Sequence, residues 1–388
     1  MSKAASEFID AIRWMAALLV VLFHATNVFV NLADIMKAPH GPLVYLWWFV
    51  TGFGFAHEGL VMFFVFSGVL VGGPLISRMR RGDRFFRRYL IDRLVRIYVV
   101  LVPVLLIGFC LDTGGRWLFA GRGVYDGVYP ASHFEPWLLV PTLFSLQGIW
   151  FIPFGTNEPL WSLGMECWYY VVFPLLFLPL AIAYSPTARA LGCVAGVLVF
   201  IALALSGSYF AFGFLLWLLG AAARLAPRPL IRDRYVALGL LAVSSVAFRL
   251  AIPASTLDTF PVKALTDGVN AVLAANLVLT LRFDEGRGFR FCALPLHKRM
   301  ADFSYSLYAL HLPVLIFLWA TTEVLIAPGW RAQLATSAHY GVAIGSVSLI
   351  LVLAYGLSRV TEARTDVARR WAHRTLPGRD EMRSSALA

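Results

Sequence analysis

Charged residues are scarce in this sequence: only 14% of its 388 residues are Asp, Glu, Lys or Arg, against about 25% in soluble domains. Hydrophobic residues account for 59% of the chain. A soluble domain of this length would bury a large core, but it would still need a charged surface around that core. The shortage of charge therefore argues against a soluble enzyme and predicts that most of the surface faces lipid.

Several functional signatures are also missing. The four cysteines show no paired spacing, so the sequence predicts neither a disulfide framework nor a zinc site, and no metal is expected. There is no G-x-S-x-G motif to mark a serine nucleophile, and no internal repeat of the kind that many transporters show. The first apolar run carries three ionisable residues and lacks the pattern of a cleaved secretory signal. We expect it to be retained as the first membrane span.

What the sequence contains instead is a series of mostly apolar stretches near the length of about 20 residues that a membrane-spanning helix needs. They predict an all-α, polytopic membrane bundle of about ten transmembrane helices. The predicted spans are 10–31, 57–76, 90–111, 159–182, 188–206, 208–223, 235–253, 263–281, 303–323 and 338–359. A further apolar run at 137–152 is interrupted by prolines, and we expect it to be a re-entrant or interfacial segment.

The basic residues predict an orientation. With the N-terminus inside, ten spans place 27 of the 33 Lys and Arg residues on the inner side, so both termini are predicted to be cytoplasmic. A net charge of +11 would suggest nucleic-acid binding in a soluble protein. Here the arginines flank apolar stretches, and no nucleic-acid partner is expected. We predict one membrane domain at 1–359 and a short basic cytoplasmic tail at 360–388, beside the inner membrane surface.

The two longest outer segments, 32–56 and 112–158, are rich in glycine, proline and aromatic residues. Loops of this length are usually functional or disordered. The aromatic content favours packed structure near the membrane surface, and a wall that binds sugar is one function that it suits.

Ionisable residues inside a span mark functional sites by default. Asp10, Arg13 and His24 share one face of the first predicted helix, because the 11 positions from Arg13 to His24 return to nearly the same angle at about 100° per residue. His24 either bonds a neighbouring helix or acts in catalysis, since neutral imidazole can take a proton from a hydroxyl near pH 7. The arginine on the same face favours the catalytic interpretation.

Other polar residues lie in or beside the later spans. Ser67 precedes a glycine in the second span, and a Ser-Gly pair there permits close helix packing. Arg93 and Arg96 lie one turn apart at the inner entry of the third span, where they are either positive-inside anchors or ligands for a phosphorylated cofactor such as coenzyme A. A buried carboxylate needs a partner, so Glu166 would hold His24, bind an acceptor hydroxyl or pair with an arginine.

Two more residues close the set. His311 in the ninth span is a second intramembrane histidine, for which a satisfied interhelical hydrogen bond and a functional role both remain open. Glu362 follows the last span, and its neighbours Arg359 and Arg364 predict a surface ion pair.

Taken in this order, these segments resemble the membrane-bound acyltransferase 3 family. The matching motifs are an Arg and a His on the first span (Arg13, His24), Phe-Phe-x-x-Ser-Gly (63–68), Arg-x-x-Arg-Ile-Tyr (93–98), Trp-Ser-Leu-x-x-Glu (161–166), Ser-Tyr-x-x-Tyr-x-x-His (304–311) and a final Glu with Arg (Glu362, Arg364). The resemblance covers essentially the whole chain. The sequence departs from the family pattern at Val99 and after Glu362, where a proline is usual, and it lacks the hydrolase-like domain that some members add.

The resemblance implies a multi-pass O-acyltransferase of the bacterial cytoplasmic (inner) membrane. It would move an acyl group, usually acetyl, from cytoplasmic acetyl-CoA or another acyl-CoA to a hydroxyl of an extracytoplasmic or membrane-bound glycan, such as O-antigen or exopolysaccharide. The partners would therefore be membrane lipid and a glycan or lipid-linked saccharide. The assigned residues are His24 and Glu166 for catalysis, Arg13, Arg93, Arg96 and Ser67 for the donor, and Asp10, Trp161, Tyr305 and His311 for the substrate.

A secondary transporter or a flippase for lipid-linked sugars is the main alternative. Ten spans with intramembrane charges suit it equally, but it should show broken helices and repeat symmetry, and it would not consume acyl-CoA. A membrane scaffold or receptor with purely structural polar residues is a further alternative.

Overall fold

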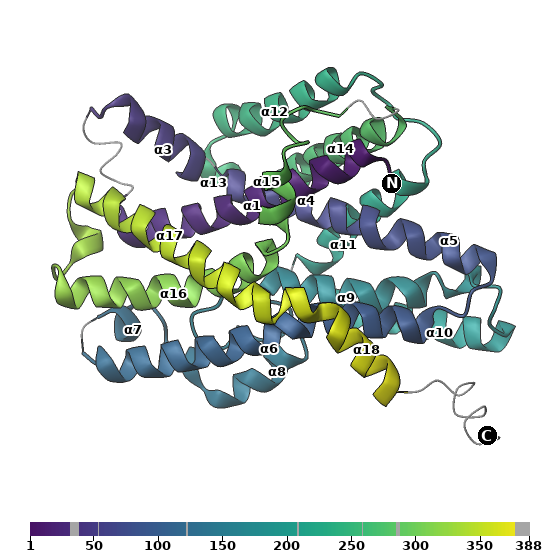
Figure 1. Ribbon diagram of the computed structural model, residues 1–388, viewed down its shortest axis with the longest axis horizontal. Coiled ribbons are helices and arrows are strands. Elements are labelled where there is room, and N and C mark those ends of the chain that lie inside the picture. The colour runs from purple at the N-terminus through teal and green to yellow at the C-terminus, as the bar shows by residue number, and fades with distance from the viewer. Residues whose placement is uncertain are drawn as a thin grey trace.

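The structure, a computed structural model, describes residues 1–31, 39–52, 54–121, 123–207, 209–257, 259–284 and 288–376. Within these residues the chain is helical and contains no named strand. An isolated bridge between Gln147 and Phe151 is the β feature that it shows. The long helices run roughly along one direction and pack as a bundle (Figure 1). Helices satisfy their own backbone hydrogen bonds, which is why long apolar segments adopt them in lipid.

Eight of the described stretches are helical, long and apolar enough to cross a membrane. They are α1 (Lys3–Phe29), Pro42–Arg81, α6 (Phe86–Leu118), α10 (Pro186–Ala204), α12 (Arg234–Ala251), α14 (Phe260–Phe283), α16 (Ser304–Leu325) and Ser337–Thr375. The fourth and sixth predicted spans are shorter helices, α9 (Leu160–Leu176) with 17 residues and α11 (Phe210–Leu225) with 16. The all-α membrane bundle is confirmed, whereas the count of ten spans stays a prediction.

Two of the long stretches combine several elements. Pro42–Arg81 contains α3 (Pro42–Gly52), α4 (Phe55–Ser67), the π-helical turn η1 (Gly68–Gly72) and α5 (Gly73–Arg81), and Ser337–Thr375 contains α17 (Ser337–Val360), η6 (Glu362–Arg364) and α18 (Thr365–Thr375). The shorter helices are α7 (Val124–Gly127), η2 (Ala131–Phe134), η3 (Pro136–Leu138), α8 (Leu139–Leu143), η4 (Leu178–Leu180), α13 (Ala254–Leu257), α15 (Pro295–Ala301) and η5 (Trp330–Ala332).

The two described ends of the chain lie toward the same side of the bundle. In Figure 1, α1 begins and α18 ends toward the right, while α3 and the connection from α16 to α17 lie at the opposite end. This arrangement agrees with the prediction from charge that both termini share one side of the membrane.

Glycines let α4 and its π-helical continuation approach α11 closely. A Cβ atom added at Gly68 would lie 1.9 Å from the carbonyl oxygen of Trp217, and one added at Gly220 would lie 1.8 Å from the carbonyl oxygen of Val65. Neither position has room for a side chain, and small residues are how membrane helices pack backbone to backbone. The prediction of close helix packing at the Ser-Gly pair is confirmed.

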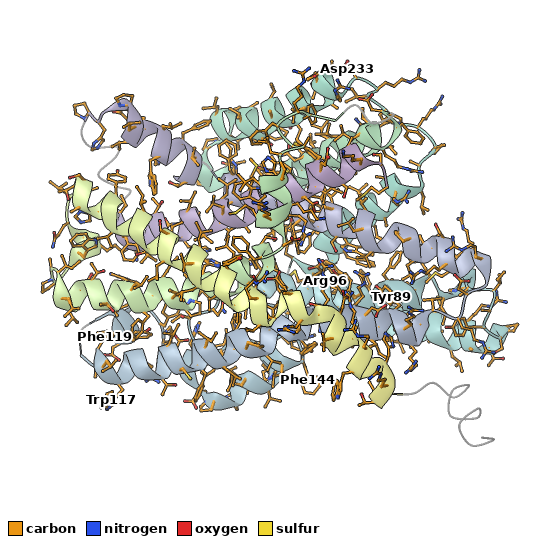
Figure 2. The ribbon with its side chains drawn as sticks, viewed as in Figure 1. Tyr89, Arg96, Trp117, Phe119, Phe144 and Asp233 are labelled. Atoms are coloured by element: carbon orange, nitrogen blue, oxygen red, sulfur yellow. The ribbon has the colours of Figure 1, made fainter. Side chains whose placement is uncertain are left out.

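The segment between α6 and α9 doubles back along α6. The carboxylate of Asp112 accepts hydrogen bonds from the backbone nitrogen (2.9 Å) and hydroxyl (3.0 Å) of Thr156, whereas Tyr98 donates to the carbonyl of Leu143 at 2.5 Å. Asp112 and Tyr98 are about 21 Å apart along the helix at 1.5 Å per residue. Figure 2 shows Phe144 well away from Trp117, which lies near the outer end of α6. The segment therefore follows the re-entrant alternative.

The predicted tail is in part a packed helix. Arg87 of α6 donates to the carbonyl of His373 at 3.2 Å, and the His373 ring lies 3.0 Å from the carboxylate of Asp92. These contacts hold α18 against α6. Residues 377–388 of the predicted tail lie outside the described residues.

The surface ion pair predicted for Glu362 is wrong. Its Oε2 accepts hydrogen bonds from the hydroxyl of Ser306 at 2.6 Å and from the backbone nitrogen of the same residue at 3.3 Å. The carboxylate is therefore bonded to the first turn of α16, and no ion pair joins it to Arg359 or Arg364 among the described residues.

Candidate functional site

A cavity of about 720 Å³ lies among α1, α4, α6, α9 and α16. At one end its wall includes Arg93 of α6 and Arg369 of α18, on the side predicted to be cytoplasmic. Farther toward the predicted outer side it includes His57 at the start of α4 and Glu158 before α9. Its size is that of a cofactor or small-molecule site.

Three arginines line the inner end of the cavity. Arg13 comes from α1, and Arg93 and Arg96 lie one turn apart on α6. Within the described part of the chain, none of the three has a carboxylate oxygen within 4.0 Å. The Nε atom of Arg93 is buried without a hydrogen-bond partner among the described residues. Arg13 and Arg93 are half-buried and Arg96 is exposed, and guanidinium groups without a close carboxylate suit an anionic ligand.

The C-terminal helix completes the inner end. Figure 2 shows Arg96 near the middle of the molecule, beside the junction of α17 and α18. From α18, Arg369 lines the same cavity, and its Nη1 lies 3.0 Å from the carboxylate of Asp366. Its Nε has no hydrogen-bond partner among the described residues. The inner end therefore presents four arginines to a ligand, and Asp302, Glu362 and Asp366 lie in the same wall.

A buried carboxylate cluster lies farther along the wall. Oε1 of Glu166 accepts hydrogen bonds from the hydroxyls of Ser67 and Tyr170, each at 2.5 Å, and the indole of Trp217 donates to Ser67 Oγ at 3.0 Å. Among the described residues no hydrogen bond joins Glu166 to His24, so the alternative in which Glu166 holds His24 is not the observed arrangement. The Ser67 hydroxyl donates its hydrogen to the carboxylate. This bond fixes the start of the π-helical turn η1 against α9.

His24 is supported by a second histidine. It lines the cavity, and its ring centroid lies 5.1 Å from that of His311, which is fully buried. Nδ1 of His311 lies 2.6 Å from the carbonyl of Tyr308, so Nδ1 carries the hydrogen and neutral His311 has its lone pair on Nε2. This Nε2 is buried without a hydrogen-bond partner among the described residues.

Tyr308 holds this region to α9. Its hydroxyl donates to the carbonyl of Pro159 at 2.7 Å and lies 2.7 Å from the hydroxyl of Ser162, which therefore donates to it. Asn157 adds a hydrogen bond to the carbonyl of Ala309 at 2.9 Å. The start of α9 is thus fixed to the same turn of α16 that carries His311.

The structure brings most of the predicted site residues together. Asp10 is not among the lining residues, and its carboxylate lies on α1 one turn from Arg13. His311 lies behind His24, outside the cavity wall. The predicted residues that line the cavity are Arg13, His24, Ser67, Arg93, Arg96, Trp161, Glu166 and Tyr305.

Several lining residues did not emerge from the sequence. His57 opens the second predicted span, and its ring contacts Asp267 of α14; the rule that ionisable residues in spans mark function would have found both. Ser162 lies in the motif that contains Glu166, and Tyr308 lies in the motif that contains His311, but neither was itself predicted as a site residue. Arg369 lies in the predicted basic tail. Its spacing of three residues from Asp366 places both side chains on one helical face, and this spacing could have indicated a helix there.

A family model described as an acyltransferase domain, of the acyltransferase 3 family, matches residues 6–357, nearly the whole chain. Searches of curated proteins and of solved structures gave no match. The matched region contains every predicted site residue, and Glu362 and the whole of α18 lie beyond it.

Proposed function

The chain belongs to the acyltransferase 3 family, and we propose that it transfers an acyl group from cytoplasmic acyl-CoA to a hydroxyl on the outer side of the bacterial inner membrane. The acyl group is acetyl in this proposal, and the acceptor is a glycan such as O-antigen or exopolysaccharide. The observation that carries the proposal is a cavity with a cluster of unpaired arginines at one end and a histidine toward the other.

The arginine cluster fits the donor. Coenzyme A carries several phosphate groups, and guanidinium groups bind phosphate in bidentate fashion. Arg13, Arg93 and Arg96 line one volume, none of them has a carboxylate oxygen within 4.0 Å among the described residues, and the buried Nε of Arg93 is open to an acceptor. The phosphates would remain at this end, while the thioester arm extends along α1 toward His24, about 16 Å from Arg13 at 1.5 Å per residue.

His24 then serves as the general base. His311 Nε2 has no hydrogen-bond partner among the described residues, and its ring lies 5.1 Å from that of His24. In this proposal its lone pair accepts the hydrogen of one ring nitrogen of His24 during the reaction, which leaves the lone pair of the other nitrogen for the acceptor hydroxyl. The hydroxyl oxygen attacks the thioester carbonyl carbon as His24 takes its proton. The C–S bond breaks, the ester C–O bond forms, and the proton passes from His24 to the departing thiolate. Atoms and charges balance without a metal or a redox step.

The proposal is tested by following label from acetyl-CoA. Purified protein in lipid nanodiscs is incubated with labelled acetyl-CoA and a glycolipid and polysaccharide extract of the source membranes. We expect label in the extract, and we expect His24→Ala to lower the rate by about 100-fold or more, since general base catalysis contributes about 10²–10⁴-fold.

A matched histidine variant gives the control. His133 lies in η2 and is not among the cavity-lining residues, so His133→Ala should retain the wild-type rate. Normal transfer by His24→Ala would overturn the mechanism. A wild-type protein that leaves acetyl-CoA intact in the presence of the extract would overturn the proposed activity and favour a transporter, which consumes no acyl-CoA.

A further inference from the structure

A second histidine in the cavity wall is held by a buried carboxylate. Nε2 of His57 lies 2.9 Å from both oxygens of Asp267, and the hydroxyl of Tyr209 also donates to this carboxylate. Asp267 is 1% exposed, whereas the His57 side chain retains 22% of its exposure and lines the cavity. The pair joins α4 to α14, and the carboxylate fixes the orientation of the ring.

The geometry leaves one nitrogen of His57 for a ligand. Because the carboxylate accepts from Nε2–H, neutral His57 has its lone pair on Nδ1. Nδ1 has no hydrogen-bond partner among the described residues. His57 lines the cavity, and a ring oriented by a carboxylate, with a lone pair on its other nitrogen, is an arrangement that can bind a hydroxyl group.

Two neighbouring charges, Glu58 and Arg249, are paired with each other. Glu58, the next residue of α4, accepts from Arg249 at 3.3 Å and from the amide of Asn270 at 2.7 Å. Neither Glu58 nor Arg249 therefore competes for His57, and both help to fix the start of α4. A charged ligand would gain no free counter-charge from these two residues.

Aromatic rings border the same region. The ring of Tyr209 lies 6.4 Å from that of His57 and 6.2 Å from that of Trp161, measured between centroids. Trp161 and Glu158 also line the cavity here. An indole beside hydrogen-bonding groups suits a ligand with apolar C–H faces and several hydroxyls. A nearby carboxylate, Glu158, disfavours an anionic ligand. This chemistry describes an uncharged sugar or polyol.

The position relative to His24 fits a second contact to one acceptor molecule. A Cβ atom at Gly59 would lie 2.8 Å from the Cβ of Ala16, so the start of α4 faces the middle of α1. Counted from this contact, His24 lies about 9 Å farther toward the predicted outer side than His57 at 1.5 Å per residue. A sugar with several hydroxyls can span this separation.

We infer that His57, oriented by Asp267, binds a hydroxyl of an uncharged, polyhydroxylated acceptor and thereby selects which other hydroxyl reaches His24. The inference rests on the proposed function and goes beyond it by assigning the acceptor site and its chemical class. His57 is a binding residue in this assignment, and Asp267 is a positioning residue that acts through it.

The test separates acceptor binding from donor binding. Initial rates in nanodiscs are measured with the glycolipid and polysaccharide extract varied at saturating acetyl-CoA, and then with acetyl-CoA varied at fixed extract. His57→Gln should raise the half-saturating extract concentration by about 10-fold, as expected for one lost hydrogen bond, and should change that of acetyl-CoA by less than about twofold. Asp267→Asn should do the same.

Two further variants make the result specific. Arg93→Gln should show the opposite pattern, with a rise for acetyl-CoA and little change for the extract. His373→Gln removes a His–Asp pair of similar length, 3.0 Å to Asp92, that is not among the cavity-lining residues, and it should leave the half-saturating extract concentration unchanged. The double variant His57→Gln/Asp267→Asn should be no weaker than His57→Gln alone, because Asp267 acts through His57.

Each outcome supports or overturns either the inference about His57 or the proposed function. Unchanged half-saturation for the extract, or equal rises for extract and acetyl-CoA, in folded His57→Gln and Asp267→Asn proteins overturns the inference while the proposed function stands. If His57→Gln does not fold, Tyr209→Phe, which removes one bond to Asp267, should still raise the half-saturating extract concentration by about two- to fivefold, and no rise overturns the inference. Absence of transfer by the wild-type protein instead overturns the proposed function on which it rests.

Discussion

The histidines of the cavity differ in what holds them. His57 is held by a carboxylate, whereas His24 has the ring of His311 beside it. Asp267 gives His57 a charged hydrogen-bond acceptor, whereas the neighbour of His24 is another imidazole ring. In the proposed mechanism His24 takes the proton of the acceptor hydroxyl and passes it to the departing thiolate. This difference assigns binding to the first histidine and proton transfer to the second.

We expect His311 to act through His24. His311→Leu should lower kcat by about 100-fold with both half-saturating concentrations within about twofold of wild type, because it removes the Nε2 lone pair that the proposed mechanism assigns to His24 as an acceptor. His311→Asn retains an oxygen acceptor and should recover about 10-fold of that loss. The measurement is the acetyl-transfer assay described above. Equal activity of the Leu and Asn variants would show that His311 only fills space.

Residues within one element were the easier ones to predict. Arg13 and His24 lie on one helix, so helical geometry alone places them on one face. His57 and Asp267 are 210 positions apart, and nothing local in the sequence brings α4 beside α14. Glu362 was misassigned for the same reason, since its partner Ser306 lies on another helix.

At the scale of elements, the packing of α4 on α11 depends on glycine. Gly220→Ala would place a methyl group against the Val65 carbonyl, 1.8 Å away, and overpacking costs about 1–3 kcal/mol or more when backbones must separate. We expect a lower midpoint of thermal unfolding in detergent, followed by fluorescence-detected size-exclusion chromatography.

Gly239 of α12 is the matched control. A Cβ atom there meets nothing within 4 Å, and alanine has the better helix propensity by about 1 kcal/mol. Gly239→Ala should therefore be neutral or stabilising. Equal midpoints for the Gly220 and Gly239 variants would contradict the close packing described for α4 and α11.

Each of the ten predicted spans coincides with helix, but two elements were not foreseen. α3 has only 11 residues, too few to register as a span, and its place beside α1 depends on the hydrogen bond from Trp47 to Thr26 at 3.1 Å. α18 is rich in arginine, and the positive-inside rule alone explained those charges. Apolar length finds spans well, whereas short or amphipathic helices are fixed by contacts with other elements.

For the whole molecule, orientation can be tested with single cysteines. In a variant lacking its four cysteines, Arg228→Cys lies between α11 and α12, and Gln333→Cys lies between α16 and α17; both native side chains are exposed. With cytoplasmic termini, a membrane-impermeant maleimide added to spheroplasts should label only the residue at 333. Inverted vesicles should give the reverse pattern, and labelling of 228 from outside would contradict the topology.

The inner wall of the cavity has a practical consequence for handling the gene. The family match ends at residue 357, yet Glu362, Thr365, Asp366 and Arg369 all face the cavity. An expression clone trimmed to the matched boundary would encode the bundle without these residues of the inner cavity wall. A reporter fused directly after α17 would replace them, so tags belong beyond α18.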